Sequence, residues 1–326
     1  MSETTGRALV SLKASELLIA EIPTIVANCG GGARFAWEEF FLGTLRNHHT
    51  RAAYLHAVRR FLSWCDSRQV ELPRITPGLV GLYLDELSLS APSQKLHLAA
   101  IRSFLDTLVQ RHVLVLNPAH SVRAPRYSAL EGKTPEITVQ QCRALLASIR
   151  SHTVVDHRDR ALIAVLIYTA ARVGAVAKLR LKDFSREGTQ FVLRFAEKGG
   201  KSRAIPVRSD LEAYIQQYWE AAGLSEFSKE EPLFRTADGR RGRLTARGVS
   251  AIDVCRMVKR RLKAARIESP ASPHSFRACA ATDLLLHGTA LEDVQHLLGH
   301  SDSRVTKLYD RRQRHVSRNI VERISV

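Results

Sequence analysis

Residues 274–309 read HSFRACAATDLLLHGTALEDVQHLLGHSDSRVTKLY, and this stretch decides how the rest of the chain is interpreted. Apolar helical patterns run over residues 275–287 and 291–298, and each is followed by a glycine. Polar side chains that can carry chemistry lie at the ends of these helices, namely His274, Arg277, His300 and Tyr309. Taken singly, His274 is equally explained as a helix-capping or surface histidine, and Tyr309 as a core tyrosine.

Together these residue types match what phosphodiester cleavage needs when no metal takes part. The transition state carries extra negative charge on its non-bridging oxygens, and arginine offers paired N–H donors to such oxygens. An attacking phenol, with a pKa of ~10, must lose a proton, and the leaving alkoxide must gain one. The chemistry therefore requires two arginines, one or two histidines, a lysine and a tyrosine.

Two further stretches supply the second arginine and the lysine. Arg172 follows a break after the apolar helical pattern of residues 158–169, so a charged side chain lies next to a helix that is expected to be buried. The other interpretation of Arg172 is a structural salt bridge, with Asp183 as the candidate partner. Lys198 begins the segment KGGKSR at the tip of a predicted β-hairpin, where the glycines allow the backbone to approach a ligand closely. The other interpretation of Lys198 is a solvated turn lysine.

The charge of the chain indicates a polyanionic partner. The 326 residues carry a formal net charge of +17, and residues 131–326 account for +13 of it. Nucleic acid is the commonest polyanion in a cytoplasm, although a basic surface can also serve solubility. The hydrophobic fraction of 45% excludes a mainly disordered chain.

Several other classes of protein are not supported by the sequence. No apolar run approaches the ~18 residues of a membrane helix and no signal-peptide pattern is present, so we expect a cytoplasmic protein. Five scattered cysteines without a Cys-x-x-Cys pair predict neither a disulfide framework nor a cysteine zinc site. His296 and His300 have the spacing of zinc ligands but lack the accompanying glutamate and a third ligand. Neither a Gly-x-Ser-x-Gly elbow nor a Walker A sequence is found.

The hydrophobic periodicity predicts a mostly helical chain. Residues 29–32, CGGG, are interpreted as a flexible break after a helix-like pattern in residues 1–28. Thr138 and Gln141 have the spacing of a capping box, and Leu96 is expected to face inward on a helix that begins at Ser93. Helices are predicted over 50–68, from 76, from 93, and over 158–169, 174–179, 210–222, 245–265, 275–287, 291–298 and 311–326, with a β-hairpin of strands 190–196 and 202–207.

The order and spacing of four motifs in this sequence resemble those of the tyrosine recombinases, the phage integrase family. YTAAR at 168–172 resembles the turn that carries the family's first arginine, and EKGGKSRAIP at 197–206 resembles its lysine hairpin, in a register that selects Lys198 over Lys201. HSFR at 274–277 and LGHS at 298–301 resemble the family's two histidine boxes. The resemblance implies the catalytic residues Arg172, Lys198, His274, Arg277, His300 and Tyr309.

Three positions depart from the family pattern. Ala175 stands where a glutamate commonly supports the first arginine, so Arg172 is expected to be held differently. Ala170 replaces a glycine, which is a mild change, and Ala278 replaces a histidine. None of the three is a catalytic position, so we expect activity to survive.

The resemblance implies a mainly α fold with a small antiparallel β-sheet. We expect an N-terminal helical extension over 1–32, a SAM-like helical core-binding domain over 33–121, a linker over 122–134 and an α+β catalytic domain with a tail over 135–326. The family forms a C-shaped clamp around double-stranded DNA and acts as a tetramer on two DNA partners. The tail, with Val316, Ile320 and Ile324 on one helical face, is expected to dock into a neighbouring subunit or to pack on its own domain.

The activity implied is site-specific recombination at the nucleoid, in DNA integration, excision or resolution by a mobile element or chromosome. Duplex DNA is cleaved and rejoined through a 3′-phosphotyrosine, with neither metal nor ATP as cofactor. In the implied mechanism Tyr309 attacks, Arg172 and Arg277 hold the non-bridging oxygens, His300 adds a hydrogen bond, Lys198 is the general acid and His274 is the base or proton relay. The alternatives are a type IB topoisomerase-like relaxing enzyme and a non-catalytic DNA-binding accessory protein. The N-terminal helical domain and the hairpin spacing favour the recombinase.

Overall fold

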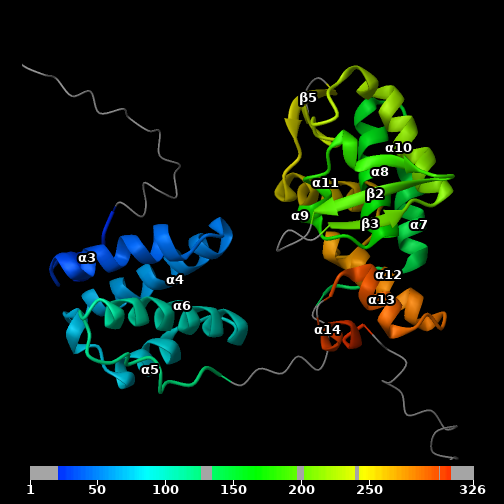
Figure 1. Ribbon diagram of the computed structural model, residues 1–326. Helices are drawn as coiled ribbons and strands as arrows, with labels where there is room; N and C mark the ends of the chain where they lie inside the picture. The colour runs from blue at the N-terminus through cyan, green and yellow to red at the C-terminus, as the bar shows by residue number, and fades with distance from the viewer. Residues whose placement is uncertain (1–20, 126–133, 197–201, 239–241, 301, 310–326) are drawn as a thin grey trace, which may run out of the picture. The chain divides into compact units, whose positions relative to one another are not determined.

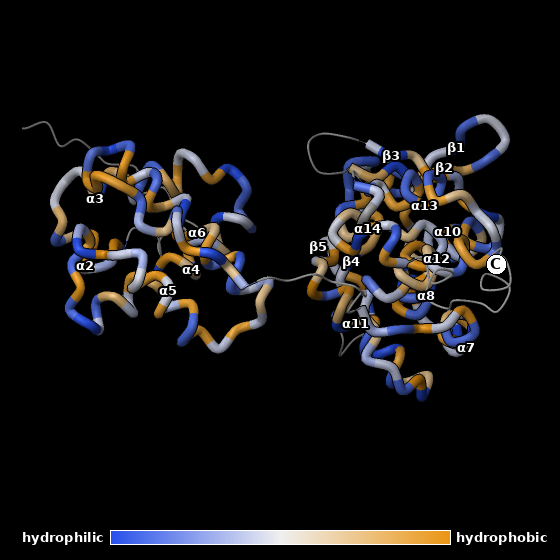
Figure 2. The backbone as a smooth tube through the Cα atoms, turned by 90° about the horizontal axis from the view of Figure 1, so that it is seen from below, coloured by the Kyte–Doolittle hydropathy of each residue, from blue (hydrophilic) through white to orange (hydrophobic). Residues whose placement is uncertain are grey.

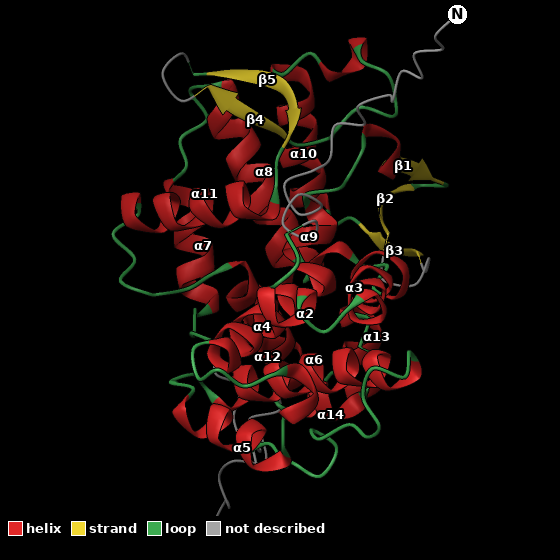
Figure 3. Ribbon diagram, turned by 90° about the vertical axis from the view of Figure 1, so that its left-hand side faces the viewer, coloured by secondary structure: helices red, strands yellow, loops and turns green. Residues whose placement is uncertain are grey.

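The computed structural model describes residues 21–125, 134–196, 202–238, 242–300 and 302–309 (Figure 1). The chain divides into two compact units, Met1–Ser128 and Ala129–Val326, each with its own hydrophobic core. Apolar and polar segments alternate along the helices of both units (Figure 2). Helices predominate, and the strands form two small antiparallel sheets in the second unit (Figure 3), which confirms the predicted fold class. No helix within the described ranges combines the length and apolar character needed to cross a membrane.

The N-terminal unit is a helical bundle whose helix starts follow ordinary capping chemistry. The Asn47 side chain accepts from the backbone N–H groups of His49, at 2.9 Å, and Thr50, at 3.3 Å. Thr76 caps the next long helix, and Pro77 takes its first position as predicted. The elements are α2 (Thr24–Ala27), α3 (Gly31–Glu38), the π-helix η1 (Glu39–Thr44), α4 (His48–Asp66), the 3₁₀-helix η2 (Leu72–Arg74), α5 (Pro77–Glu86) and α6 (Ala91–Gln110).

Aromatic side chains fill the centre of this bundle. The ring centroids of Trp37 and Phe41 are 4.5 Å apart, and those of Trp37 and Phe104 are 5.6 Å apart in an edge-to-face arrangement. Ile25 and Val26 are buried in the same core. The chain that precedes α3 therefore contributes to the stability of this unit.

The break predicted at residues 29–32 is shorter than expected. Gly30, at φ +91°, is the residue that caps α3, and Gly31 and Gly32 already belong to the helix. Only the left-handed backbone of Gly30 requires a glycine here. The other two glycines take ordinary helical conformation, which the sequence pattern could not distinguish from a loop.

The expected inward position of Leu96 was wrong. Helix α6 begins at Ala91 rather than at Ser93, and Leu96 is 41% exposed. The buried face of α6 includes His97, whose Nδ1 lies 3.0 Å from the Tyr83 hydroxyl. Because that face passes through His97, the adjacent Leu96 points outward.

The C-terminal unit places the long apolar helix α8 at its centre. The capping box predicted for Thr138 and Gln141 is confirmed at the start of α7. The elements are α7 (Val139–Ser148), α8 (Val154–Thr169), α9 (Val173–Val176), η3 (Leu181–Asp183), β1 (Phe184–Glu187), β2 (Gln190–Ala196), β3 (Ser202–Pro206), α10 (Ser209–Ala221), η4 (Leu224–Glu226), β4 (Arg235–Asp238), β5 (Arg243–Gly248), α11 (Ala251–Ala264), α12 (Pro273–Leu286), α13 (Leu291–Leu298) and α14 (Ser303–Lys307).

The predicted hairpin is confirmed as β2 and β3, which pair antiparallel with Leu193 opposite Ile205. The short strand β1 extends it to three strands, and β4 and β5 form a separate sheet. The helix predicted over 245–265 was wrong in its first part, because that segment is strand β5. Gly248 ends this strand at a point where a Cβ would lie 3.1 Å from the Pro232 side chain, and α11 begins only after Ser250.

A buried carboxylate joins α8 to α11. Asp159 is fully buried, and its Oδ1 accepts a hydrogen bond of 2.9 Å from Arg158 Nε. Its Oδ2 accepts from Arg260, at 2.9 Å, and from Arg261, at 2.7 Å. Both oxygens are thus satisfied by guanidinium groups, as a buried charge requires.

Helices α12, α13 and α14 gather at one end of the C-terminal unit (Figure 1). Helix α13 has the predicted bounds, Leu291–Leu298. A small apolar cluster forms here from Ala170, Ala281, Leu285, Val294, Leu298 and Tyr309. The predicted patterns in residues 1–20 and 311–326, most of the predicted linker and the tip of the lysine hairpin lie outside the described residues.

Candidate active site

Helix ends bring the predicted site residues together within the C-terminal unit. Arg172 precedes α9, His274 and Arg277 lie in the first turns of α12, and the other two described residues follow α13 and α14. Those two are His300 and Tyr309, whose rings stack with centroids 6.2 Å apart and planes 15° apart. The sixth predicted residue, Lys198, lies outside the described residues.

Arg277 is the buried centre of the arrangement, with 1% of its surface exposed. Its Nη1 donates to the carbonyl of Ala170 at 2.6 Å, and its Nη2 donates to the carbonyl of Leu298 at 2.5 Å. These carbonyls lie at the C-terminal ends of α8 and α13, where helices leave acceptors unsatisfied and carry partial negative charge. One guanidinium therefore connects two helix ends and is fixed by them.

The turn after α8 has a left-handed backbone at Ala170, with φ +49° and ψ +23°. This conformation is unfavourable for residues other than glycine by about 1–2 kcal/mol. Ala170 is fully buried against the apolar cluster, so its methyl group regains part of this cost by packing. The turn directs the Ala170 carbonyl toward Arg277 and lets Arg172 begin the next helix.

Arg172 is exposed, and its Nη2 donates to the carbonyl of Gly299 at 3.4 Å. The alternative salt bridge to Asp183 is not formed, because that carboxylate accepts from the backbone N–H of Arg180 at 2.8 Å. With Ala175 in the position where the family commonly has a glutamate, the Gly299 carbonyl is what holds Arg172. The guanidinium retains donors for a ligand.

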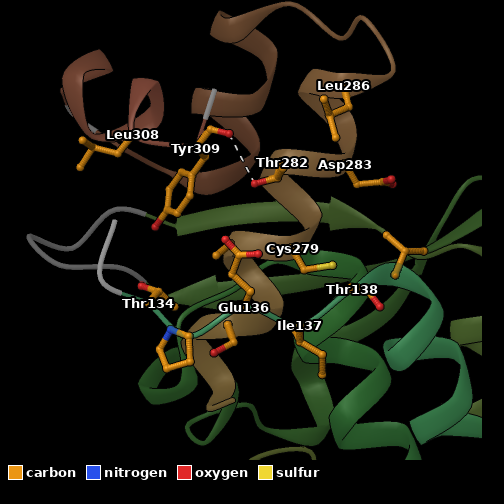
Figure 4. A pocket seen from close by; sticks show the side chains of 14 residues that line it. Thr134, Glu136, Ile137, Thr138, Cys279, Thr282, Asp283, Leu286, Leu308 and Tyr309 are labelled. Atoms are coloured by element: carbon orange, nitrogen blue, oxygen red, sulfur yellow. Dashed lines mark hydrogen bonds between the residues drawn. The ribbon is translucent and has the colours of Figure 1, made fainter. Parts of the chain in front are cut away.

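Tyr309 is held by its backbone, and its phenol reaches His274. Its N–H donates to the Thr306 carbonyl at 3.0 Å, and its carbonyl accepts from the Thr282 hydroxyl at 3.4 Å (Figure 4). The side chain is 9% exposed, and Oη lies 3.5 Å from Nε2 of His274. This separation is at the long end of the hydrogen-bond range, as is common for catalytic pairs without substrate.

Both histidines are neutral at neutral pH. Desolvation, followed by the charges of Arg277 and Arg172, lowers the pKa of His274 below its ordinary value. Desolvation and the same arginines, with His274 and Arg203, lower the pKa of His300 to about 4. A neutral imidazole can accept a proton at one nitrogen while it donates from the other.

A cavity of about 230 Å³ adjoins Tyr309. Figure 4 shows Thr134 and Ile137 on one side and Cys279, Leu286 and Leu308 among the other lining residues. Small and apolar side chains thus form much of a recess immediately beside the residue that precedes the tail.

Two residues near the site were missed by the sequence analysis. Thr306 is fully buried, and its Oγ1 lies 2.9 Å from Nδ1 of His300. Arg203, on β3, contributes to the lowered pKa of His300. For Thr306 the only signal in the sequence was its position, six residues after His300 and three before Tyr309, whereas Arg203 lies within the EKGGKSRAIP segment.

The profile described as "Phage integrase family" matches residues 135–315, and the profile "Phage integrase, N-terminal SAM-like domain" matches residues 37–112. The chain belongs to the phage integrase family. It is 30% identical over 288 residues to "Tyrosine recombinase XerD" of Chlorobaculum tepidum, an alignment that covers 85% of this chain and 88% of the relative. It is thus a tyrosine recombinase by descent, and the topoisomerase-like and non-catalytic alternatives are not favoured.

Solved structures of recombinases share this fold. XerH bound to its palindromic difH substrate matches with a TM-score of 0.68 and 17% identity, over 94% of this chain and 92% of that chain. A lambda integrase tetramer bound to a Holliday junction matches with a TM-score of 0.61 and 20% identity, over 85% of this chain and 76% of that chain. The arrangement of helices around the five described site residues is therefore that of a known fold.

Proposed function

We propose that this recombinase cleaves duplex DNA by attack of Tyr309 Oη on the scissile phosphorus. The P–O bond to Tyr309 forms as the bond to the 5′ oxygen breaks, which leaves a 3′-phosphotyrosine. The phenolic proton passes to His274, and Lys198 gives a proton to the 5′ leaving oxygen. Rejoining reverses these steps with the 5′-hydroxyl of the partner strand. The observation that carries the proposal is the 3.5 Å approach of Tyr309 Oη to a neutral His274.

The two arginines have different parts in this proposal. Arg277 is fixed by two carbonyls before substrate arrives, so its positive charge acts on the phosphate without reorganisation. Arg172 is exposed and lightly held, so it can adjust to the second non-bridging oxygen. His300 donates from its free nitrogen to the same phosphate. Preorganised donors of this kind are worth about 10²–10³ in rate each.

Neither metal nor ATP is needed in this scheme. The phosphotyrosine keeps the energy of the broken phosphodiester, and the arginines neutralise charge that a metal would otherwise neutralise. Cleavage should persist in excess EDTA. A requirement for a divalent ion in the cleavage step would contradict the proposal.

Duplex DNA is the proposed partner, with four copies of the chain acting on two sites. The net charge of +17 and the fold shared with a DNA-bound lambda integrase tetramer support this. The tail residues Val316, Ile320 and Ile324 are proposed to dock into the recess beside Tyr309 of the same or a neighbouring copy; its apolar lining residues Ile137, Leu286 and Leu308 support this. A cytoplasmic, nucleoid-associated location stays a prediction.

The test is a trapped covalent adduct. The binding site is first selected from a random duplex library, and a nicked version of it is then incubated with wild type and with Tyr309→Phe. Wild type should accumulate a denaturant-stable adduct, whereas Tyr309→Phe should bind equally and form none. An adduct with Tyr309→Phe would refute the nucleophile. Plasmids with one or two matched sites then separate relaxation from strand exchange.

A further inference from the structure

The His300 ring is in contact with a buried hydroxyl that the mechanism above does not use. Thr306 Oγ1 lies 2.9 Å from Nδ1 of His300, and Thr306 is fully buried. The backbone of His300 is also fixed, because its N–H donates to the Gln295 carbonyl at 3.1 Å and its carbonyl accepts from Gln295 Nε2 at 3.0 Å. The remaining variable is which ring nitrogen carries the proton.

We propose that Thr306 is a positioning residue, whose hydroxyl donates to Nδ1 of His300 and thereby keeps the single N–H of the neutral ring on Nε2. The inference rests on the proposed role of His300 at the phosphate. Nδ1 and Nε2 lie on opposite sides of an imidazole, so a bond from Thr306 at Nδ1 leaves Nε2–H directed away from Thr306. That nitrogen can then donate to a phosphate oxygen.

The direction of this hydrogen bond follows from counting donors. If Nδ1 carried the proton, Thr306 would accept it, and the hydroxyl hydrogen would need another acceptor in a fully buried place. The bond to His300 is the one side-chain hydrogen bond of Thr306 within the part of the chain that the structure describes. Two other buried threonines, Thr107 and Thr169, instead donate to carbonyls four residues back. A buried donor without an acceptor is costly. If the Thr306 hydroxyl donates to Nδ1, no buried donor is left without an acceptor.

The charges around His300 make the Thr306 hydroxyl decisive for which ring nitrogen carries the proton. Desolvation, followed by the charges of Arg277, Arg172 and Arg203, lowers the pKa of His300 to about 4 and keeps the ring neutral. A positive charge that faces Nε2 favours a bare lone pair on that nitrogen, which is the opposite tautomer. Without the Thr306 hydroxyl, the ring should therefore move its proton to Nδ1. Nε2 would then face the phosphate with no hydrogen to donate.

The experiment reads the tautomer directly in the full-length protein. Ring-nitrogen NMR shifts are recorded at pH 7.5 with ¹⁵N-labelled histidine, and the His300 signals are assigned by their loss in His300→Gln. Wild type and Thr306→Ser should show a protonated Nε2, and Thr306→Val should show a protonated Nδ1. A protonated Nδ1 in wild type overturns the inference, and this result needs no variant to fold. An unchanged tautomer in Thr306→Val also overturns it.

Cleavage kinetics link the tautomer to the reaction. Single-turnover adduct formation should slow roughly tenfold or more in Thr306→Val, with DNA affinity unchanged and Thr306→Ser close to wild type. Thr107→Val, which removes a buried hydroxyl in the other unit, is the matched control and should leave the rate unchanged. A tautomer switch without a slower rate would support the hydrogen bond and refute the proposed role of His300, so the two failures are distinguishable.

Discussion

Substitution of Arg277 should destabilise the fold, whereas substitution of Arg172 should not, although both arginines serve the reaction. Arg277 donates charge-assisted hydrogen bonds to two helix-end carbonyls, at 2.6 and 2.5 Å. Each such bond stabilises by about 1.5–3 kcal/mol. A lysine ammonium in its place is a compact point charge and cannot reproduce the pair of bonds that the planar guanidinium fork makes. Arg277→Lys should therefore lower the free energy of unfolding by about 1.5–3 kcal/mol.

The control is Arg172→Lys, which preserves charge at an exposed residue with one long bond of 3.4 Å. Its stability should stay within about 0.5 kcal/mol of wild type. In calorimetry, the transition of the C-terminal unit should fall by about 3–12 °C for Arg277→Lys and hardly move for Arg172→Lys. Single-turnover cleavage should fall by about 10²–10³ in both variants.

Two results would refute this reasoning. An unchanged melting transition in Arg277→Lys would show that the two carbonyl bonds do not join α8 and α13 in solution. An equal loss of stability in Arg172→Lys would show that exposure does not distinguish the arginines. Activity alone cannot decide, since both variants should be impaired.

The remaining predictions concern the acid, pH and the buried carboxylate. Lys198→Ala should be badly impaired on normal DNA but rescued on a 5′-bridging phosphorothiolate, whose thiol leaves with little protonation; rescue of Lys201→Ala instead would move the role there. Because the folded pKa of His300 is lowered to about 4, the unfolded chain binds the extra proton, so stability should fall as pH drops from ~6.5 toward 4. Urea titrations should show a shallower fall in His300→Gln; equal slopes would contradict the assignment. Asp159→Asn should lose about 3–5 kcal/mol by denaturant midpoint, because it leaves the buried Arg158 guanidinium without a carboxylate, and a neutral result would argue against the network.

Local chemistry made much of the fold predictable. The capping box at Thr138 and the proline at the first position of α5 depend only on nearby residues, and both are confirmed. Strand β5 was misassigned because its extended form depends on pairing with β4 and on the close approach of Pro232 to Gly248. Neither of these contacts can be read from hydrophobic periodicity.

The site was predictable as a set of residue types but not as a structure. The spacing of arginine, histidine and tyrosine indicated the chemistry, and the structure places five of the six at adjoining helix ends. The spacing in the sequence did not indicate that Arg277 would bind the carbonyls of Ala170 and Leu298, because those partners are 107 and 21 residues away. The spacing also did not reveal Thr306, because a threonine in a short helix has no distinctive sequence pattern. Its importance follows only from its contact with His300 in the folded protein.

The turn at Ala170 shows how the site tolerates a departure from the family pattern. A left-handed alanine costs about 1–2 kcal/mol relative to glycine. Its methyl group is fully buried in the cluster with Ala281 and Leu285, and burial of one such carbon returns about 0.8 kcal/mol. Glycine would also lose more backbone entropy on folding. These terms nearly cancel, so alanine can occupy the turn while its carbonyl still accepts from Arg277. At this position the site requires that the backbone carbonyl points toward Arg277. The hydrogen bond from Arg277 itself helps to hold the carbonyl in that direction.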